Sequence, residues 1–268
     1  MPARITVVSG SGRYADPWHP FATTSARVAE ILRDAGRDVT VTDDVDASLA
    51  ALADPTGLAD SDDLPEPAGR THPAGLAHPP SSIDPATHDP DLLVLNVGAG
   101  STPEDRAVVQ SSDERAALPL SAADAATRDG LLGYLGRGGA LLVLHVSSTS
   151  FGYMPEWESI LGGIWLRGTS MHPPYSLAHI EVATDAHPIV AGIRDFDVND
   201  ERYSHLRVSP DVTELAWHDL DGARHPVLWA RERGSVRVVY DALGHDSASY
   251  DAPAHRALLR QAAAWLLG

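Results

Sequence analysis

The first fifty residues alternate between short apolar runs and one longer segment with helical periodicity. The run "RITVVSG" at residues 4–10 combines β-branched residues with a terminal glycine, which predicts a buried strand that ends in a turn. Apolar residues then recur on one helical face over residues 21–35, and Gly36 follows as a typical helix stop. The segment "DVTVT" (residues 38–42) predicts a second strand.

The middle of the chain repeats this order of strand, helix and strand. "DLLVLNVGAG" (residues 91–100) is a continuous apolar run of the kind found in parallel strands that are covered on both faces. A helix predicted over residues 121–135 leads through "GRGG" into "ALLVLHV" (residues 140–146). Strands joined by a helix indicate a right-handed crossover, and therefore a parallel sheet.

From about residue 180 the pattern changes to shorter strand-like segments. These are "HIEVAT", "TELAWH", "PVLWARE" and "VRVVYDAL", and a helix predicted over residues 254–267 closes the chain. The sequence thus predicts one α/β domain over residues 1–268. Its sheet should be mostly parallel, central and flanked by helices, with extra and partly antiparallel carboxyl-terminal strands.

One long segment interrupts this pattern. Residues 54–90 contain eight of the chain's 20 prolines, seven acidic residues, Arg70 as the one basic residue, and no aromatic residue. Such a composition cannot build a core of its own. We therefore expect a Pro/Asp-rich loop insertion or lid rather than a domain.

Charge and composition narrow the choice of partners. The formal net charge of the 268-residue chain is -17, so nucleic acid and anionic lipid surfaces are poor partners and a neutral small molecule fits better. No run approaches 18 apolar residues and no export signal is recognisable, which predicts a cytoplasmic protein with no membrane partner. An oligomer is compatible with these features.

Two missing residue types exclude whole classes of chemistry. The chain has no cysteine and no lysine, so thiolate catalysis, Cys-ligated metals and Schiff bases are impossible. Thirteen histidines remain available for proton transfer or metal binding.

The glycine-rich segment after the first strand loosely matches a dinucleotide-binding pattern. It reads Gly10 to Ala15, but Pro17 and Pro20 delay the helix whose amino terminus would have to meet a pyrophosphate. A plain strand-to-helix loop at the carboxyl edge of the sheet is the better interpretation. Ligands bind at that edge in open α/β sheets, which makes Trp18 and His19 candidate substrate contacts.

A histidine ends the apolar strand in "ALLVLHVSSTSFG". Many α/β enzymes hold one reactive side chain at such a strand tip, although the glycines of a hydrolase elbow are missing here. His145 is therefore a candidate catalytic residue, with Ser147 beside it as a candidate substrate contact. For an isolated histidine, a structural role would be the simpler interpretation.

Other histidines and carboxylates follow in a recognisable pattern. The segment from His187 reads "HPI..G...F.V.DE.Y", and a late strand ends in "LGHD" at His245 and Asp246. Together with "GG.L..LH" before His145, this pattern resembles the trehalose-utilisation (ThuA-like) family over nearly the whole chain outside residues 54–90.

The resemblance implies a fold similar to class I glutamine amidotransferases, which is a flavodoxin-like α/β arrangement. His145 would then occupy the place of the amidotransferase cysteine, and His245 with Asp246 would lie near the place of its histidine. Because the nucleophilic thiol is absent, glutamine hydrolysis through a thioester is excluded.

The family resemblance also implies a role in carbohydrate catabolism. Its members are associated with the breakdown of trehalose and related disaccharides, in company with a sugar oxidoreductase that makes 3-keto sugars. We therefore expect a lyase or hydrolase that processes a disaccharide such as trehalose, or its 3-keto derivative, by His/Glu acid-base chemistry.

The adjacent acids of "NDERY" should have different roles, since neighbouring residues on a strand point to opposite faces. Tyr203 shares a face with Glu201 if the segment is extended. This favours Glu201 as a catalytic acid or base, with His145 as its counterpart and His245 as a stabilising group. Tyr203 and Asp200 remain candidate substrate contacts.

Several imidazoles would also suit a divalent metal ion such as zinc or manganese. The candidate ligands are His145, His172 and His245, with His19 as a further member of such a cluster. Trp18 or Trp165 could form an aromatic platform for a sugar ring.

Two other interpretations stay open at this point. The first is a non-catalytic sugar-binding or regulatory protein on the same fold, which the missing nucleophile would suit. The second is an ester hydrolase that uses Ser147 or Ser148 with His245 and Asp246.

Overall fold

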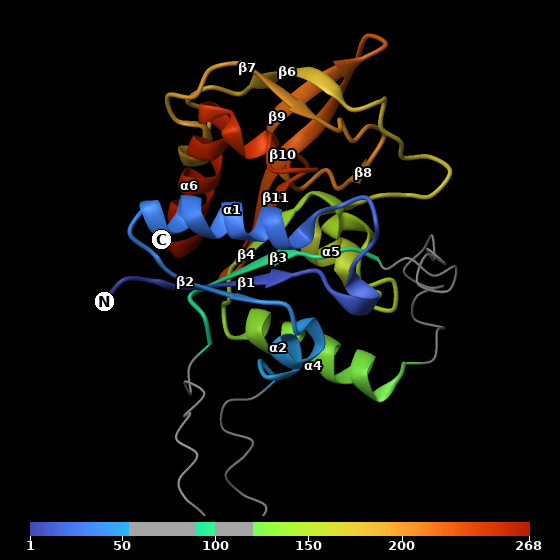
Figure 1. The fold of residues 1–268 in the computed structure, drawn as a ribbon, viewed down its shortest axis with the longest axis vertical. Helices are drawn as coiled ribbons and strands as arrows, with labels where there is room; N and C mark the ends of the chain where they lie inside the picture. The colour runs from blue at the N-terminus through green and yellow to red at the C-terminus, as the bar shows by residue number, and fades with distance from the viewer. Residues whose placement is uncertain (54–88, 100–119) are drawn as a thin grey trace, which may run out of the picture.

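The structure, a computed structural model, describes residues 1–53, 89–99 and 120–268. Within these residues nine strands form one sheet, shown in Figure 1. In spatial order the strands are β2 (Asp38–Thr42), β1 (Arg4–Ser9), β3 (Leu92–Asn96), β4 (Leu141–Leu144), β11 (Val236–Asp241), β10 (Ala223–Arg233), β9 (Thr213–Leu220), β6 (Ser176–Val182) and β7 (Phe196–Asp200). Two further strands, β5 (Gly163–Ile164) and β8 (Arg207–Val208), pair with each other.

The sheet has a parallel part and an antiparallel part. Strands β2, β1, β3, β4 and β11 are parallel to one another. Antiparallel pairing begins between β11 and β10 and continues through β9, β6 and β7. This order confirms the expected α/β fold with additional carboxyl-terminal strands.

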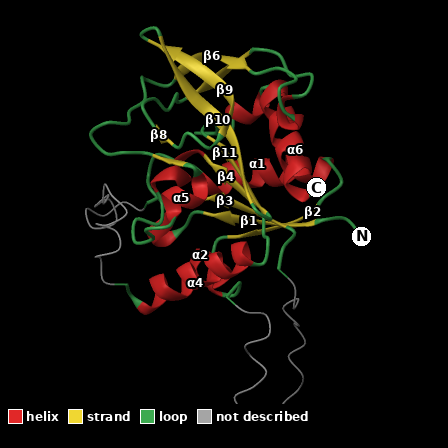
Figure 2. Ribbon diagram, turned by 180° about the vertical axis from the view of Figure 1, so that it is seen from behind, coloured by secondary structure: helices red, strands yellow, loops and turns green. Residues whose placement is uncertain are grey.

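Helices cover both faces of the parallel part. Helices α1 (Phe21–Asp34) and α6 (Pro253–Leu267) lie on one face, and α2 (Val45–Ala50) and α4 (Ala122–Gly136) lie on the other, as Figures 1 and 2 show. The short helix α5 (Trp157–Leu161) contacts β5 and β11. Four 3-10 turns in the described residues span Gly12–Tyr14, His145–Thr149, Pro188–Val190 and Ser249–Asp251.

This layering explains the continuous apolar runs in the sequence. Every residue of β3 and β4 is buried, because both faces of these central strands meet helices. Helices α2 and α4 pack so closely that a Cβ atom at Gly130 would lie 1.8 Å from the carbonyl oxygen of Leu49. Only glycine permits this approach.

The main helices and strands predicted from the pattern are present. Helices predicted over residues 21–35, 121–135 and 254–267 correspond to α1, α4 and α6 with small shifts at their ends. The short helices α2 and α5 were not predicted, because six or fewer residues hold too little periodicity. The loop expected over residues 54–90 lies outside the described residues apart from 89 and 90.

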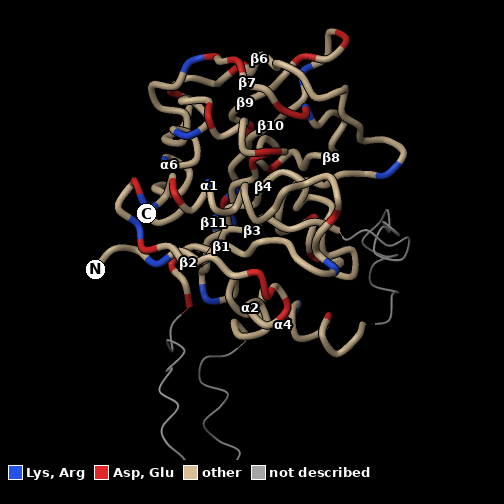
Figure 3. Tube along the Cα trace, viewed as in Figure 1, with Lys and Arg blue, Asp and Glu red and all other residues tan. Residues whose placement is uncertain are grey.

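The longest helices of the described residues have 15 residues, and charges of both signs occur along the chain (Figure 3). No helix among them has the length and apolarity needed to cross a bilayer. Figure 3 shows basic positions scattered among acidic ones, without a continuous basic face in that view of the described chain.

Candidate metal centre and substrate pocket

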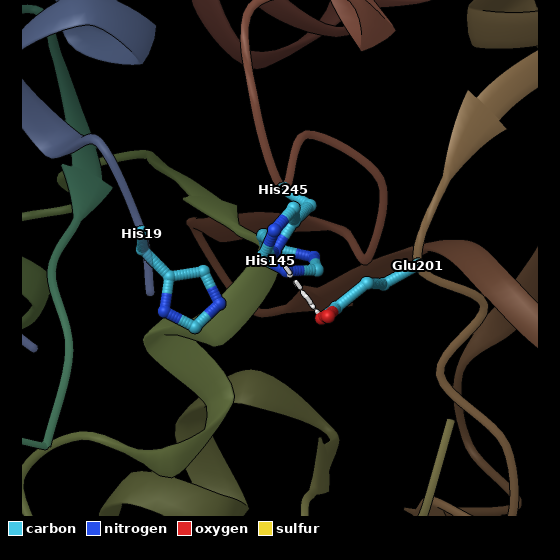
Figure 4. A group of neighbouring side chains, drawn as sticks. All are labelled: His19, His145, Glu201 and His245. Atoms are coloured by element: carbon cyan, nitrogen blue, oxygen red, sulfur yellow. Dashed lines mark ion pairs between the residues drawn. The ribbon is translucent and has the colours of Figure 1, made fainter. Parts of the chain in front are cut away.

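Four side chains from distant parts of the sequence meet at one edge of the sheet: His19, His145, Glu201 and His245 (Figure 4). One potential ligand atom of each lies within 4.8 Å of that of every other. The histidines follow the carboxyl ends of β1, β4 and β11, whereas Glu201 follows β7. The parallel part of the sheet thus supplies three imidazoles, and the antiparallel part supplies the carboxylate.

His145 stands where β4 turns into the 3-10 helix His145–Thr149. Its φ of 40° lies in the left-handed region, which a non-glycine residue adopts only when its surroundings hold it there. Its Nδ1–H donates to the carbonyl of Ala242 over 2.7 Å, and the Tyr240 hydroxyl donates to the His145 carbonyl over 2.8 Å. The ring is therefore fixed with Nε2 directed at Glu201, 3.6 Å from Oε2.

His19 is oriented by Asp16, which lies three residues before it. The Asp16 carboxylate accepts from the backbone N–H groups of Trp18 and His19 and lies 2.8 Å from Nδ1 of His19. Burial lowers the pKa of His19, and burial together with the nearby His145 and His245 outweighs the raising effect of Asp16. His19 is therefore a neutral imidazole, and its Nε2 has no hydrogen-bond partner.

Glu201 and His245 form the charged part of the group. Oε2 of Glu201 lies 3.2 Å from Nδ1 of His245. Burial raises the pKa of Glu201, but attraction to His145 and His245 outweighs this and holds that pKa well below its usual range. Burial lowers the pKa of His245, but Glu201 outweighs burial and raises that pKa above its ordinary value.

Three ring nitrogens in this group are buried without a hydrogen-bond partner: Nε2 of His19, Nε2 of His145 and Nδ1 of His245. Leaving a polar atom in this state costs free energy. Such atoms in a native fold therefore call for a ligand, and here all three point into a group that also holds a carboxylate.

The donor set fits a divalent first-row transition metal such as zinc or manganese. Neutral imidazoles and a carboxylate are the preferred ligands of these ions. In metal sites the second ring nitrogen of a ligating histidine is usually fixed by a carboxylate or a backbone carbonyl. Asp16 does this for His19, and Ala242 does it for His145.

Three members of the group, His19, Glu201 and His245, line a cavity of about 700 Å³, whereas His145 is buried behind this lining. This volume falls in the range of sites that enclose small organic ligands. The lining residues are Asp16, Pro17, Trp18, His19, Ala99, Val146, Thr149, Trp165, Arg167, His172, Glu201, Tyr203 and His245.

Aromatic side chains shape this cavity next to the metal-binding group. The Tyr203 ring stacks on His145 with 4.3 Å between centroids, and Trp165 meets Tyr203 at 4.6 Å. Trp18 lies in the same lining with 57% of its surface exposed. An exposed aromatic face beside polar groups is suited to packing against a sugar ring.

Comparisons with known proteins identify the family and agree with the fold. The family model described as ThuA, trehalose utilisation, matches residues 105–266, which is more than half of the chain. The chain belongs to the ThuA family. None of the curated proteins matches its sequence significantly.

Solved structures resemble this ThuA-family chain along its whole length. A protein described as ThuA-like from Parabacteroides merdae ATCC 43184 aligns with a TM-score of 0.64 and 17% identity, covering 100% of this chain and 90% of the other. A second ThuA-like protein, from Bacteroides uniformis ATCC 8492, has a TM-score of 0.64, 14% identity, and 99% and 91% coverage. A cytoplasmic protein from Salmonella typhimurium LT2 aligns with a TM-score of 0.53, 11% identity, and 99% coverage of both chains. At these identities the likeness shows the fold alone.

The structure corrects two of the expected substrate contacts. Ser147 is fully buried; its hydroxyl donates to the Leu95 carbonyl and accepts from the Val97 N–H. Asp200 is also fully buried and is absent from the cavity lining. Ser147 follows β4, whose residues are all buried, and Asp200 lies at the buried end of the edge strand β7. Their side chains form hydrogen bonds within the protein instead of reaching the cavity.

The structure also argues against a serine hydrolase, because the candidate serines and Asp246 form other hydrogen bonds. The Ser148 hydroxyl bonds to the His145 carbonyl and to the Tyr240 hydroxyl, and Asp246 accepts from Tyr175 and from the Ala248 N–H. Neither Ser147 nor Ser148 is hydrogen-bonded to His245 in the described structure, and no nucleophile–base pair forms.

His172, which was predicted as a metal ligand, lies beside the group of four. The fourth potential ligand is Glu201 instead. The His172 side chain is 37% exposed, and its Nδ1 lies 3.1 Å from the carbonyl of Pro173 and 3.6 Å from Oε1 of Glu201. His172 therefore belongs to the cavity wall.

Asp16 was missed by the sequence-based reasoning. The signal was present as an aspartate three residues before His19, a spacing at which a carboxylate can accept from the following backbone N–H groups. Arg167 also lines the cavity and carried no recognisable pattern.

Proposed function

We propose that this chain is a carbohydrate-active enzyme that holds a divalent transition-metal ion with His19, His145, Glu201 and His245. Its substrate is a disaccharide such as trehalose or, more directly, the 3-keto derivative. The observation that carries the proposal is the convergence of three buried, unpartnered ring nitrogens and one carboxylate beside an open cavity. A bound ion would offset the cost of burying these atoms without partners.

The support for a sugar substrate comes from the cavity and from the family. A volume of about 700 Å³ accommodates two sugar rings, and Trp18 and Trp165 offer aromatic faces in its lining. The overall charge of -17 favours a neutral ligand over a phosphorylated one. The family itself is described by trehalose utilisation.

An ion in this position supplies Lewis-acid polarisation of a substrate oxygen. In this arrangement His145, Glu201 and His245 act as ligands rather than as the acid and base themselves. Another side chain that lines the cavity would then transfer the proton. His172 has the position for this transfer, because it lies 3.6 Å from Glu201 and is partly exposed to the cavity.

For a 3-keto disaccharide the proposed step is an elimination. His172 removes the C2 proton, which the neighbouring C3 carbonyl acidifies. The C2–H electron pair forms the C1–C2 double bond as the C1–O bond breaks. The departing sugar oxygen leaves with its electron pair and takes up the proton that His172 removed, so that the base is regenerated and no oxidant is consumed. A sugar oxidoreductase that forms the 3-keto group would supply this substrate.

A proton NMR time course tests the proposal. The purified protein is freed of metal with a chelator, then incubated with trehalose or 3-keto-trehalose, alone and with Zn²⁺ or Mn²⁺. We expect loss of the anomeric signals of the keto sugar only when an ion is present. Turnover that ignores both chelation and added ions would overturn the metal centre. Saturable sugar binding without turnover would favour a binding protein instead.

A further inference from the structure

The buried carboxylate of Asp200 accepts hydrogen bonds from four donors. Oδ1 accepts from the backbone N–H groups of Glu201 (2.8 Å) and His245 (3.0 Å). Oδ2 accepts from the backbone N–H of Gly244 over 2.7 Å and from the Ser249 hydroxyl. The residue is 0% exposed, so its bonds are made within the protein.

These bonds tie together two parts of the metal-binding group. Glu201 follows β7 at the antiparallel end of the sheet, and His245 follows β11 in the parallel part. β7 and β11 are separated by β10, β9 and β6, so strand pairing does not set the distance between Glu201 and His245. One carboxylate that holds both backbone N–H groups does set it.

A second layer of buried groups holds Asp200 in turn. The Ser249 hydroxyl lies 3.0 Å from Nδ1 of His255, and Nε2 of His255 lies 2.8 Å from Oδ2 of Asp241. Oδ1 of Asp241 accepts from the backbone N–H of Leu243 over 3.0 Å. The loop that presents His245 is thus fixed from both sides.

Gly244 shows how closely this loop is packed. Its φ of +107° suits glycine alone, and a Cβ atom there would lie 2.2 Å from the Tyr250 hydroxyl. The backbone before His245 therefore has little freedom to adapt if Asp200 is altered.

We propose that Asp200 is a positioning residue of the metal centre, acting through the backbone of Glu201 and His245 rather than by contact with ion or substrate. The inference rests on the proposed metal centre. A carboxylate is required because four donors converge on its two oxygens, whereas an asparagine offers one acceptor oxygen and an NH₂ group. The two adjacent acids thus have different roles: Asp200 binds the backbone of the two loops, and Glu201 offers its carboxylate to the metal ion.

The test compares Asp200→Asn with Asp46→Asn in the full chain. Asp46 is a matched control, because it also accepts from several side chains, Arg13, Tyr14 and Thr127, but lies outside the cavity lining. Zn²⁺ affinity is measured by titration calorimetry, and the geometry of the site by the absorption spectrum of bound Co²⁺. Thermal unfolding of the metal-free proteins reports stability separately.

We expect Asp200→Asn to weaken Zn²⁺ binding about 10- to 100-fold and to shift the Co²⁺ bands, as removal of an outer partner does in metal sites. Asp46→Asn should lower stability while leaving both readouts as in the wild type. Ser249→Ala removes one of the four donors and should weaken Zn²⁺ binding in the same direction by a smaller factor. If Asp200→Asn does not fold, the Zn²⁺ affinity of Ser249→Ala tests the positioning role.

Wild-type Zn²⁺ affinity in both Asp200→Asn and Ser249→Ala would overturn the positioning role while leaving the metal centre intact. A wild-type protein that binds neither Zn²⁺ nor Co²⁺ would overturn the metal centre itself and this inference with it.

Discussion

Two groups in this structure contain histidine and carboxylate side chains, yet the hydrogen bonding of their ring nitrogens differs. In the pair of His255 and Asp241 each ring nitrogen has a partner: Nε2 meets Asp241, and Nδ1 meets Ser249. In the group of His19, His145 and His245, one ring nitrogen of each has no hydrogen-bond partner, although two of these nitrogens lie near the Glu201 carboxylate. Residue type is shared, so it does not by itself identify a site. The convergence of three such nitrogens beside one carboxylate does.

The largest difference between the two groups should appear when His145 is replaced. His145→Ala removes a ligand atom, and a metal site that supplies several kcal/mol of transition-state stabilisation should lose about 1,000-fold or more in turnover. The control is His179→Ala, which removes an exposed histidine on β6 that pairs with Asp197. Metal content and the NMR assay are measured for both variants. Full activity of His145→Ala would contradict the assignment of His145 as a metal ligand.

Replacing His255 should give the opposite result. His255→Gln leaves Asp241 buried without its partner, and removal of one member of a buried pair costs about 3 kcal/mol of unfolding free energy. The effect on Zn²⁺ affinity should be only a few-fold, because His255 acts on the site through Ser249 and Asp200. Chemical denaturation and titration calorimetry separate the two effects. If His255→Gln lost as much metal binding as His145→Ala, the distinction between a structural pair and a metal-binding group would not hold.

The contribution of His255 should also depend on pH. Burial lowers the pKa of His255, but Asp241 outweighs burial and raises it above the ordinary value of 6.5. The folded state then keeps a proton that the unfolded state releases, so the stabilisation is complete below pH about 6.5 and is lost as pH rises through the folded pKa. The free energy of unfolding of the wild type and His255→Gln should converge as pH rises. A gap that widens above neutral pH would contradict the raised pKa.

The smallest expected effect concerns the aromatic wall of the cavity. Trp18→Ala should raise KM for the sugar by about 3- to 10-fold, corresponding to roughly 1 kcal/mol of ring packing, with little change in kcat. Trp217→Ala is the matched control, because Trp217 lies on β9 and packs against Arg224 away from the cavity. Equal KM values for both variants would remove Trp18 from the sugar-binding surface.

Most of the fold could be predicted from hydrophobic periodicity. The strands around β1, β3, β4 and β11 are apolar because helices cover both faces, and that burial leaves a direct record in the sequence. The short elements α2 and α5 left too few turns to be recognised.

The candidate site was predicted only in part. The sequence pointed to His19, His145, Glu201 and His245, since each follows an apolar strand or belongs to a family-like segment. It did not determine that Glu201 rather than His172 completes the group, nor that Asp200 turns inward to the backbone of two loops. Such choices depend on how loops from different strands meet.

The sequence by itself determined the class of fold, the family and the chemistry that is excluded, because these follow from local patterns and from residue types that are absent. Only the tertiary structure decided which histidines keep an unpartnered nitrogen and where those nitrogens point. The reason is physical: a hydrogen bond such as that between His145 and Ala242 joins residues 97 positions apart, and no local pattern records it.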